Sequence, residues 1–527
     1  MARTQLFASV RSAIIKARLA LPDAPPPGPR AISRRAAMAL LAGSAAAACT
    51  PKSKAAETAK SPVAIVGGGT SGLVVAWRLA TAGVPTEIYE SSGRTGGRMY
   101  TLRQFTPEGH FCELGGELVD SNHKALIDLC GELGISIQRL RAENGGASDL
   151  YDIGGKQRLD NDLLDPKTQA GAFMPVARRI AADQAMLLDK DENWTPRAHE
   201  LDAMPLSRYL DSLKGSTEKW VIDLLSLAYF GEYGIPLDQQ SSLNFVDFIG
   251  TDDNATFAMF GDSDESHRIA GGSGTLPETL TDRLSKAPLS DRSKINLRHV
   301  LSAIERDGDG FKLTFDGPDG PVNRSFGRVV LALPFTKLRE VKGLGGLGLS
   351  AEKMRTINEL GYGANAKLMI GTSSRPWTQS LNGINTPLTG TIYSDRGMQI
   401  VWDTSVGQEG VGGVLTNFMF GDRALGEETP ALETMVKGLT ALSPELGKAL
   451  TPNVRASFFW PNYPHMKASY AGCLVGQYTS FLINAAKTEL DGRLFFAGEH
   501  TSSESVGFMN GAVDAGERVA KEMLTQV

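Results

Sequence analysis

Short apolar runs and helical spacing alternate at both ends of the chain. Apolar runs at 63–66, 328–333 and 493–497 have the length and composition of buried strands. A helical pattern follows the first run and stops at Gly83, and a second strand is expected at 86–89. The last helical pattern repeats at i, i+4, i+7 and i+11 along an inner face made of Ala512, Gly516, Val519 and Met523. Strands and helices in this alternation predict an α/β fold with a parallel sheet.

A β-meander is predicted between Thr281 and Pro334. Strand-like runs at 295–297, 300–305 and 311–315 lead to the buried run that ends before Pro334. Asp-Gly and Pro-Asp-Gly sequences separate some of these runs. They predict tight turns, because glycine adopts the positive φ that such turns need.

Two longer stretches separate these elements. Helical patterns predominate between 122 and 264, and two examples are 206–213 and 219–229. The pattern is mixed between 336 and 452, where strand-like runs occur at 366–371 and 399–403. Neither stretch contains a glycine-rich loop between a strand and a helix, so both are expected to form a separate part of the fold.

The first 60 residues differ from the rest in charge. Residues 1–49 carry seven Lys or Arg and one acid, so their removal would change the net charge from −5 to −11. Arg34-Arg35 precedes a short apolar stretch and a small-residue end at Cys49, which indicates an export signal of the twin-arginine kind. A disordered Ala-rich tail and an Arg-rich organellar presequence remain alternatives. With 50–61 as a polar linker, we expect an exported protein, periplasmic or extracellular, with lipidation at Cys49 left open.

A glycine-rich turn joins the first strand to the first helix. Residues 67–72, GGGTSG, fit G-x-G-x-x-G, and the second strand ends on Glu90, 18 residues after Gly72 (90 − 72). Gly67 permits the tight turn, Gly69 lets the backbone approach a pyrophosphate, and Gly72 lets helix and strand pack closely. The helix N-terminus then faces the phosphates, and Glu90 can accept from a ribose hydroxyl. The chain is therefore predicted to bind a dinucleotide.

Two features favour FAD over a nicotinamide dinucleotide. A meander inserted into a dinucleotide-binding fold fits flavoproteins better than nicotinamide dehydrogenases. The helix that begins after Gly507 also offers a second helix N-terminus, which would stabilise the negative charge that accumulates on a reduced flavin.

Composition and charge exclude several other classes. Hydrophobic residues make up 42% and charged residues 21%, as in an ordinary soluble globular protein, and a net charge of −5 gives no reason to expect nucleic acid as a partner. The four cysteines have no C-x-x-C spacing, so they indicate neither a metal site nor a disulfide framework. No window reaches about 18 uninterrupted apolar residues, so no permanent transmembrane anchor is expected.

Several of these stretches together resemble the flavin-containing amine oxidase family, which includes monoamine, polyamine and L-amino-acid oxidases. The resemblance runs from about Pro62 to the C-terminus and is specific in eight motifs that occur in family order. They are GGGTSG with Glu90, GRTGGR (93–98), ELGGEL (113–118), RIAGGSGTL (268–276), VVLALP (329–334), Lys367 after GYGANA, Trp460-x-x-x-Pro464-x-x-x-Ala468-Ser469-Tyr470, and FFAGEHT…GFMNGAVDAGERVA.

The resemblance implies two domains, both discontinuous in sequence. One is a Rossmann-like FAD-binding domain with the β-meander, expected at 62–121, 265–335 and 453–527. The other is a mixed α+β substrate domain, expected at 122–264 and 336–452.

The resemblance also implies the residues that bind FAD. Arg98 would meet the pyrophosphate, Glu499 the ribityl–phosphate region and Val300 the adenine side, while residues 115–118 line the isoalloxazine and 507–512 cap the flavin ring. The expected cofactor-binding residues are Gly67, Gly69, Ser71, Gly72, Glu90, Gly97, Arg98, Gly115, Gly116, Glu117, Leu118, Val300, Glu499, Gly507, Phe508, Met509 and Ala512. The position that attaches FAD covalently in some members aligns with Ser469 rather than Cys473, so non-covalent FAD is expected.

Four residues are expected at the reacting end of the flavin. The lysine matching Lys367 holds a water beside flavin N5 in this family and assists the reaction with oxygen, whereas a lone lysine on an apolar strand is more often an edge residue that reaches solvent. Tyr470 and Phe508 match two rings that face each other in front of the flavin, where they guide the amine and exclude water. Trp460 is expected in the same site.

One departure from the pattern concerns the substrate. L-amino-acid oxidases commonly have an arginine just after the ELG segment to clamp the substrate carboxylate, and here Leu118 stands at that position with Glu117 before it. Leucine cannot pair a carboxylate, and a nearby anion would attract the second ammonium of a diamine. This departure favours amines, although an arginine from elsewhere in the chain could still reach the pocket.

The expected reaction is therefore FAD-dependent oxidative deamination of an amine. Hydride passes to flavin N5 and O2 is the acceptor, which gives H2O2, ammonia and a carbonyl product. An L-amino-acid oxidase that gives a 2-oxo acid is the main alternative, and a non-catalytic flavin-binding scaffold is a remoter one. A homodimer is among the assemblies left open.

Overall fold

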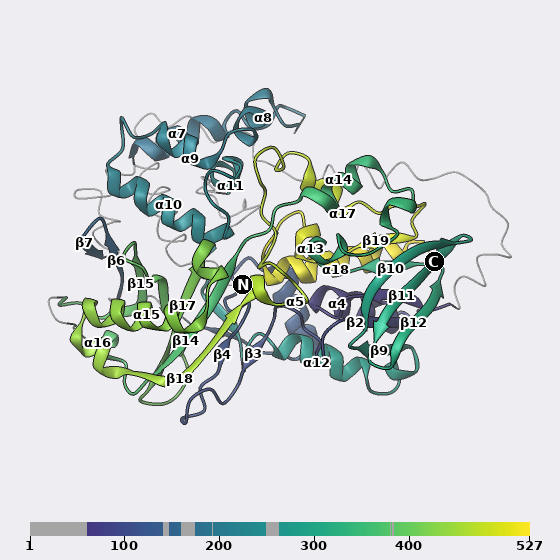
Figure 1. Cartoon of the computed structure of the whole chain (residues 1–527), viewed down its shortest axis with the longest axis horizontal. Coiled ribbons are helices and arrows are strands. Elements are labelled where there is room, and N and C mark those ends of the chain that lie inside the picture. The colour runs from purple at the N-terminus through teal and green to yellow at the C-terminus, as the bar shows by residue number, and fades with distance from the viewer. Residues whose placement is uncertain are drawn as a thin grey trace.

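The computed structural model describes residues 61–140, 147–159, 174–191, 193–248, 263–379, 381 and 384–526. A five-stranded parallel sheet forms its nucleotide-binding part, to the right in Figure 1. Its strands, in spatial order, are β19 (Leu494–Phe496), β13 (Val329–Leu331), β1 (Val63–Val66), β2 (Thr86–Glu90) and β9 (Ser293–Leu297). The predicted parallel sheet is confirmed, and it places the last strand of the chain two positions from the first.

Helices from both ends of the chain cover this sheet. Helix α4 (Thr70–Thr81) packs against α18 (Met509–Leu524), where a Cβ on Gly516 would lie 2.7 Å from the carbonyl oxygen of Ser71. Only glycine permits so close an approach of one helix to the backbone of another. Their apolar faces join those of α5 (Lys124–Leu133) and α12 (Thr275–Leu284) in one buried core. The helices predicted after the first strand and at the C-terminus are both confirmed.

The β-meander is real, but its limits differ from the prediction. It consists of three antiparallel strands, β10 (Val300–Asp307), β11 (Gly310–Gly317) and β12 (Gly320–Phe326). The run at 295–297 belongs to β9 and pairs with β2 in the parallel sheet, because local spacing does not say which partner a strand will find. Strand β12 was not predicted, since most of its side chains are solvent-facing and polar.

A seven-stranded sheet forms the second part of the molecule, at the lower left of Figure 1. In spatial order its strands are β18 (Leu450–Phe459), β14 (Asn365–Thr372), β17 (Gly413–Phe420), β16 (Gln399–Asp403), β15 (Leu388–Ser394), β6 (Ser148–Ile153) and β7 (Lys156–Leu159). The strands predicted at 366–371 and 399–403 are confirmed as β14 and β16. Because β14 pairs on both sides, with β17 and β18, it is an interior strand.

Helices lie above this sheet, at the upper left of Figure 1. They are α7 (Met174–Gln184), α8 (Pro196–Asp202), α9 (Leu206–Asp211), α10 (Lys219–Tyr233) and α11 (Leu243–Val246). The helices predicted at 206–213 and 219–229 are confirmed as α9 and α10. The main side-chain core between them and the sheet includes Tyr151, Tyr229 and Phe418.

The structure places two elements across the expected domain boundaries. Helix α5, expected in the substrate domain, packs in the core of the parallel sheet, because its buried Leu126 and Cys130 face that core. Strand β18 begins the segment expected to return to the FAD-binding domain, yet it is an edge strand of the seven-stranded sheet. Register and burial, rather than chain position, decide both placements.

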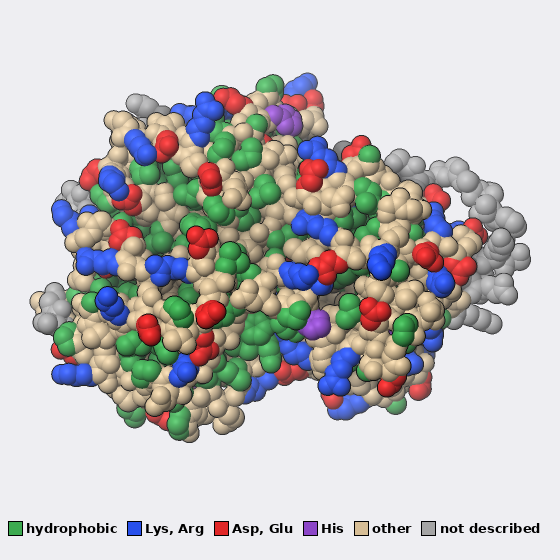
Figure 2. Space-filling model, viewed as in Figure 1, with side chains coloured by type: hydrophobic (Ala, Val, Ile, Leu, Met, Phe, Trp, Pro, Cys, Tyr) green, Lys and Arg blue, Asp and Glu red, His purple; other side chains and the backbone are tan. Residues whose placement is uncertain are grey.

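The face of the molecule in Figure 2 shows no strong charge asymmetry. Acidic and basic side chains are interspersed over the face in Figure 2, with no patch of a single sign. Within the described part of the chain, no helix is long and apolar enough to span a membrane, and no cluster of His, Cys, Asp and Glu side chains has the arrangement of a metal site. The predicted export signal and Cys49 lie outside the described residues.

The turn between β1 and α4 gives a first prediction. A Cβ on Gly72 would lie 2.1 Å from the Gly67 carbonyl oxygen, so Gly72→Ala must push the helix away from the strand. Overpacking of this kind costs about 3 kcal/mol, and we expect a clear fall in Tm by calorimetry together with loss of FAD.

Gly131→Ala is the matched control. Gly131 lies in α5 with nothing within 4 Å of an added Cβ, so the same substitution there should stabilise the helix by about 0.5–1 kcal/mol. Equal Tm values for Gly72→Ala and the parent would contradict the proposed close packing.

Candidate FAD-binding and active site

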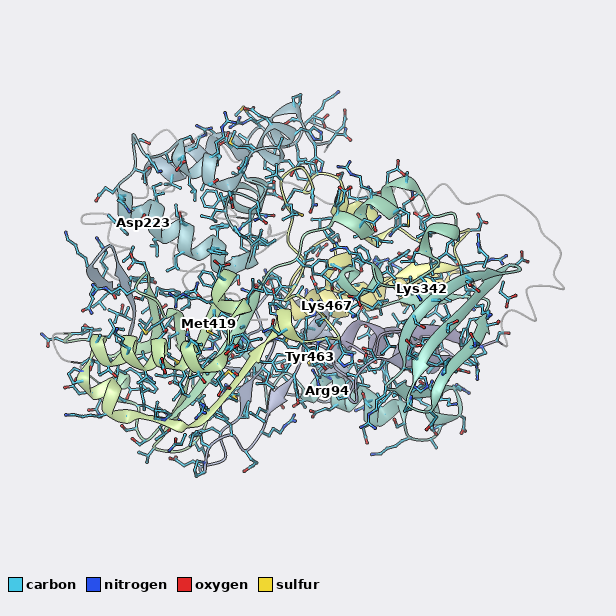
Figure 3. The ribbon with its side chains drawn as sticks, in the orientation of Figure 1. Arg94, Asp223, Lys342, Met419, Tyr463 and Lys467 are labelled. Carbon is cyan, nitrogen blue, oxygen red and sulfur yellow. The ribbon has the colours of Figure 1, made fainter. Side chains whose placement is uncertain are left out.

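A cleft of about 890 Å³ opens along the carboxyl ends of the parallel strands. Segments from both ends of the chain line it, and ligands bind at this edge in open α/β sheets. Eleven of the residues expected to bind the cofactor line this cleft: Gly67, Gly69, Ser71, Glu90, Gly97, Arg98, Glu499, Gly507, Phe508, Met509 and Ala512. Arg94 and Tyr463, which also line it, lie near the centre of Figure 3, where the two parts of the molecule meet.

The glycine-rich turn fits a pyrophosphate. Gly67 has φ +109°, and a Cβ there would lie 2.6 Å from the Ala332 carbonyl oxygen, so the turn cannot carry a larger residue. The nearest neighbour of a Cβ on Gly69 is 4.0 Å away, so the backbone at this residue is open to the cleft. Gly69 is also the N-cap of α4 and offers no side-chain cap, which leaves the helix N-terminus available to phosphate oxygens.

Glu90 is held at one end of the cleft. Its Oε2 accepts a hydrogen bond from the Gly68 N–H at 2.7 Å, and its Oε1 accepts one from the Ser92 N–H at 2.8 Å. A carboxylate oxygen accepts more than one hydrogen bond, so the fixed carboxylate can also receive ribose hydroxyls. The charge and placement of Glu90 suit the adenosine end of a dinucleotide.

An ion pair joins the two ends of the chain inside the cleft. Arg98 Nη1 lies 2.7 Å from Glu499 Oε1, and the other oxygen of Glu499 accepts the Gly507 N–H at 2.7 Å. Burial alone would raise the pKa of Glu499, but Arg98 and the hydrogen bonds outweigh it and hold that pKa below its usual value. Arg98 also donates to the Ser469 carbonyl at 3.0 Å. Its charge therefore stays fixed beside the site expected for the pyrophosphate.

Residues 115–118 lie against Arg98 rather than on the wall of the cleft. The Gly116 N–H donates to the Arg98 carbonyl at 3.0 Å, and a Cβ on Gly115 would lie 1.9 Å from that oxygen. Leu118 is half-buried. Gly72 is a packing residue of the turn, and Val300 is 37% exposed and outside the lining of the cleft. Direct contact of FAD with this group stays a prediction.

Lys367 is buried and paired, so the interpretation as an edge lysine is wrong. Its Nζ lies 2.7 Å from Glu117 Oε2, and both side chains are 1% exposed. Lys367 is on the same face of β14 as Asn365, whose amide accepts from Ser469 and donates to the Gly231 carbonyl of α10. The chemical role of Lys367 stays a prediction.

The three expected aromatic residues are all buried, and each has its own contact. Trp460 donates its indole N–H to the Leu114 carbonyl at 2.8 Å, and Tyr470 donates its hydroxyl to the Glu232 carbonyl at 2.6 Å. Phe508 lines the cleft. Trp460 thus holds the segment that carries residues 115–118, and the facing arrangement of Tyr470 and Phe508 around a substrate stays a prediction.

The structure brings one further pair to this end of the site. His123 accepts the Asp120 N–H on Nδ1 at 3.0 Å, with its Nε2 3.2 Å from Asp120 Oδ2, and its ring lies edge-on to Phe508 at 4.9 Å. Sequence analysis missed both residues, because neither belongs to a recognised motif. Their signal was Asp-x-x-His at the start of a helix directly after the ELGGEL motif. Asp120 thus fixes His123, which packs against the Phe508 ring.

The residues present fit FAD, and no thiol stands at the position for covalent attachment. Ser469 occupies that position and gives its hydroxyl to Asn365 Oδ1 at 2.6 Å. The described cysteines, Cys112, Cys130 and Cys473, are buried and lie outside the lining of the cleft. The N-termini of α4 and α18, neither of which has a side-chain cap, both line this dinucleotide cleft, and this arrangement defines the class of the protein as an FAD-dependent oxidoreductase.

Comparison with known proteins places the chain within that class. Residues 70–524 match the family model for flavin containing amine oxidoreductase. The chain belongs to this family, and it is an FAD-dependent oxidoreductase that acts on amines.

Individual relatives are more distant. An L-amino acid dehydrogenase of Synechocystis is 25% identical over 497 residues, which cover 87% of this chain and 94% of the relative. Flavin-containing amine oxidase B of mouse is 22% identical, over 88% of this chain and 86% of the relative. Solved structures of a putrescine oxidase and of cyclohexylamine oxidase from Brevibacterium oxydans each align with a TM-score of 0.73 at 20% and 19% identity, over 89% of this chain and 99% of theirs. These structures share the fold.

The buried ion pair gives the second prediction. Glu499→Gln leaves Arg98 without its counterion, and breaking a buried pair costs roughly 3–5 kcal/mol, so we expect a lower free energy of unfolding and weaker FAD retention at pH 7. Because the folded pKa of Glu499 lies below 4.5, its stabilisation is present above that pH and is lost as the pH falls through the folded pKa.

Denaturant titrations from pH 7 to pH 3 measure this difference. The difference in free energy of unfolding between parent and variant should become smaller as the pH falls. A difference that stays constant with pH would contradict the charge contribution of Glu499.

Proposed function

We propose that this protein catalyses the oxidative deamination of an amine that carries no α-carboxylate, with O2 as the electron acceptor. The products are a carbonyl compound, ammonia and hydrogen peroxide. One observation carries the choice of an amine over an α-amino acid, and it concerns the cations at the site.

Each cation that the described residues bring to the site already has an acceptor. Arg98 pairs with Glu499 and Lys367 with Glu117. Arg94 donates to the carbonyls of Thr95 and Gly97 at 3.1 and 2.6 Å. Arg268, which is buried, donates to the carbonyls of Thr404 and Val406 at 2.8 and 2.5 Å. A bidentate clamp for a substrate carboxylate needs an arginine whose guanidinium faces the substrate. Leu118 stands where that arginine is expected. The site therefore favours a substrate whose reacting end is a neutral amine.

The side chains at the reacting end provide position and exclude water. We expect Tyr470 and Phe508, both buried, to form apolar walls on either side of an uncharged amine and to keep water from the reacting carbon. Bound in this cleft, FAD would supply the acceptor for hydride from the α-carbon, with oxygen as the final electron acceptor. The amine must arrive deprotonated, so no strong general base is needed. His500 is not such a base, since burial lowers its pKa to about 3 and it packs against Phe335.

The structure removes one argument for a diamine. Glu117 was expected to attract a second ammonium, but its carboxylate is 1% exposed and committed to Lys367. Its charge is therefore already compensated and cannot select a distal cation. The proposed substrate class is a monoamine or polyamine, without a preference derived from Glu117.

An L-amino acid is the second candidate substrate class. It is favoured by the relative named L-amino acid dehydrogenase and by a putative L-amino-acid oxidase of Bacillus subtilis, which is 23% identical. The first of these relatives is named a dehydrogenase. For the reoxidation of the flavin, an electron acceptor other than O2 is therefore the alternative.

We also propose that the protein is exported with FAD already bound. The basic pair Arg34-Arg35 with its short apolar stretch supports the twin-arginine route, which carries folded proteins. A homodimer is the proposed assembly.

A substrate screen tests the proposed reaction. Purified FAD-loaded protein is given primary amines, diamines, polyamines and L-amino acids in air, and hydrogen peroxide is measured. We expect peroxide with one or more amines and at least tenfold less with the amino acid of the same side chain. Activity confined to α-amino acids would contradict the amine assignment. Substrate-dependent bleaching of the flavin without peroxide would contradict O2 as the acceptor.

Lys367→Met tests the reaction with oxygen. We expect the variant to retain FAD but to reoxidise at least tenfold more slowly in air, because the cation that stabilises developing negative charge is gone. Stopped-flow absorbance after anaerobic reduction measures the rate. Lys342→Met is the matched control, since Lys342 is exposed and lies beside the meander (Figure 3). Equal reoxidation of the Lys367 variant and the control would remove Lys367 from this step.

A further inference from the structure

Glu117 and Lys367 form an ion pair that solvent does not reach. The Nζ–Oε2 distance is 2.7 Å, and the pair joins β14 to the loop after β4 (Cys112–Glu113), 250 residues apart in sequence. Two charges removed from water are costly unless geometry and further hydrogen bonds compensate. The hydrogen bonds around the pair therefore show how its burial is compensated.

The second oxygen of Glu117 is held as firmly as the first. Its Oε1 accepts the Thr404 hydroxyl at 3.0 Å and the Trp402 indole N–H at 3.2 Å. The Trp402 ring also lies 5.1 Å from the Lys367 ammonium, within the range of a cation–π contact. Three donors on its two oxygens hold the carboxylate in a single orientation. The fixed carboxylate in turn holds the Lys367 ammonium in a single position.

The chain neighbours of the pair are linked to the wall of the proposed flavin site. Gly116, next to Glu117, donates to the carbonyl of Arg98, which lines the cleft. On the other side, Asn365 lies two residues before Lys367 and accepts from Ser469, whose carbonyl receives Arg98. The chain neighbours of the pair thus reach Arg98, Gly116 directly and Asn365 through Ser469.

Other charged groups surround the pair but do not replace either partner. Arg268 is buried nearby and lowers the pKa of Glu117, as Lys367 does; together these effects outweigh the rise that burial alone would cause. Glu113 and Cys112 are close, and burial raises the pKa of each, in Glu113 to about 7. Glu113 accepts from Ser273 and Thr101, so it is hydrogen-bonded away from Lys367.

We propose that Glu117 is a positioning residue for Lys367, which fixes its ammonium against Trp402 and compensates its charge, so that the flavin faces a neutral ion pair rather than an isolated cation. This inference deepens the proposed function and rests on it, because it takes Lys367 to face the flavin. An isolated cation would favour the reduced, anionic flavin; the pair moderates that effect. Glu117 thus sets the tendency of the bound flavin to accept electrons.

The midpoint potential of the bound flavin tests the charge compensation. Parent, Glu117→Gln, Lys367→Met and the double variant are reduced at pH 7 against reference dyes, without substrate. We expect Glu117→Gln to raise the equilibrium constant for reduction at least tenfold, about 30 mV for a two-electron couple. We expect Lys367→Met to lower it by a similar factor, and the double variant to return to within threefold of the parent.

A purely structural role for Glu117 predicts a different pattern. It would lower Tm in each single variant while leaving the potentials within twofold of the parent, and that result overturns the proposal. Single variants that shift the potential in the same direction would also overturn it. Glu489→Gln is the matched control. Glu489 is a buried carboxylate that accepts a hydrogen bond from Ser350, so the flavin in this variant should have the same midpoint potential as in the parent.

A further comparison covers the case in which Glu117→Gln loses FAD. If Glu117→Gln does not retain FAD, Lys367→Met is compared with the double variant, where removal of the lone carboxylate should raise the equilibrium constant at least tenfold; equal values overturn the proposal. The measurement needs no amine, so failure of the proposed function in the substrate screen and failure of this inference are distinguishable.

Discussion

The ion pair between Arg98 and Glu499 is the interaction on which the site depends. The two residues are 401 positions apart, and their side chains meet at 2.7 Å inside the cleft. Glu499 also accepts the Gly507 N–H just before α18. The Arg98 carbonyl accepts the Gly116 N–H and so fixes the segment 115–118. Strands β1, β13 and β19 make this meeting possible, because their parallel pairing brings both ends of the chain to one edge of one sheet.

A second constraint is the burial of the charged side chains. Lys367, Glu117, Arg98 and Glu499 are all largely or fully buried, and each has a specific partner. Charges in a low-dielectric interior act on their neighbours far more strongly than they would in water, so small rearrangements of such pairs have large electrostatic effects. The same burial that makes these pairs costly makes them effective beside a redox cofactor.

Sequence patterns predicted much of this arrangement where the signal was local. The glycine turn, Glu90 and the C-terminal helix follow from spacing and residue type, and the structure places them in one cleft. The meander was predicted with the wrong first strand, because a strand's own residues do not identify its partner. Helix α5 was assigned to the wrong part, since its apolar face fits either core until the sheet is assembled.

At the reacting end of the site, too, local motifs were predicted and contacts between distant segments were not. Lys367 was recognised from its motif, and Glu117 from its place after the glycines, but their pairing across 250 residues was not foreseen. The contact of His123 with Phe508, and the pairing of His123 with Asp120, were not predicted either.

The sequence by itself determined the family, the FAD turn and the elements of the sheet, because these depend on spacing within a few residues. The tertiary structure alone decided which charges neutralise one another. That outcome depends on distance and burial between segments far apart in the chain, and no local pattern contains either quantity.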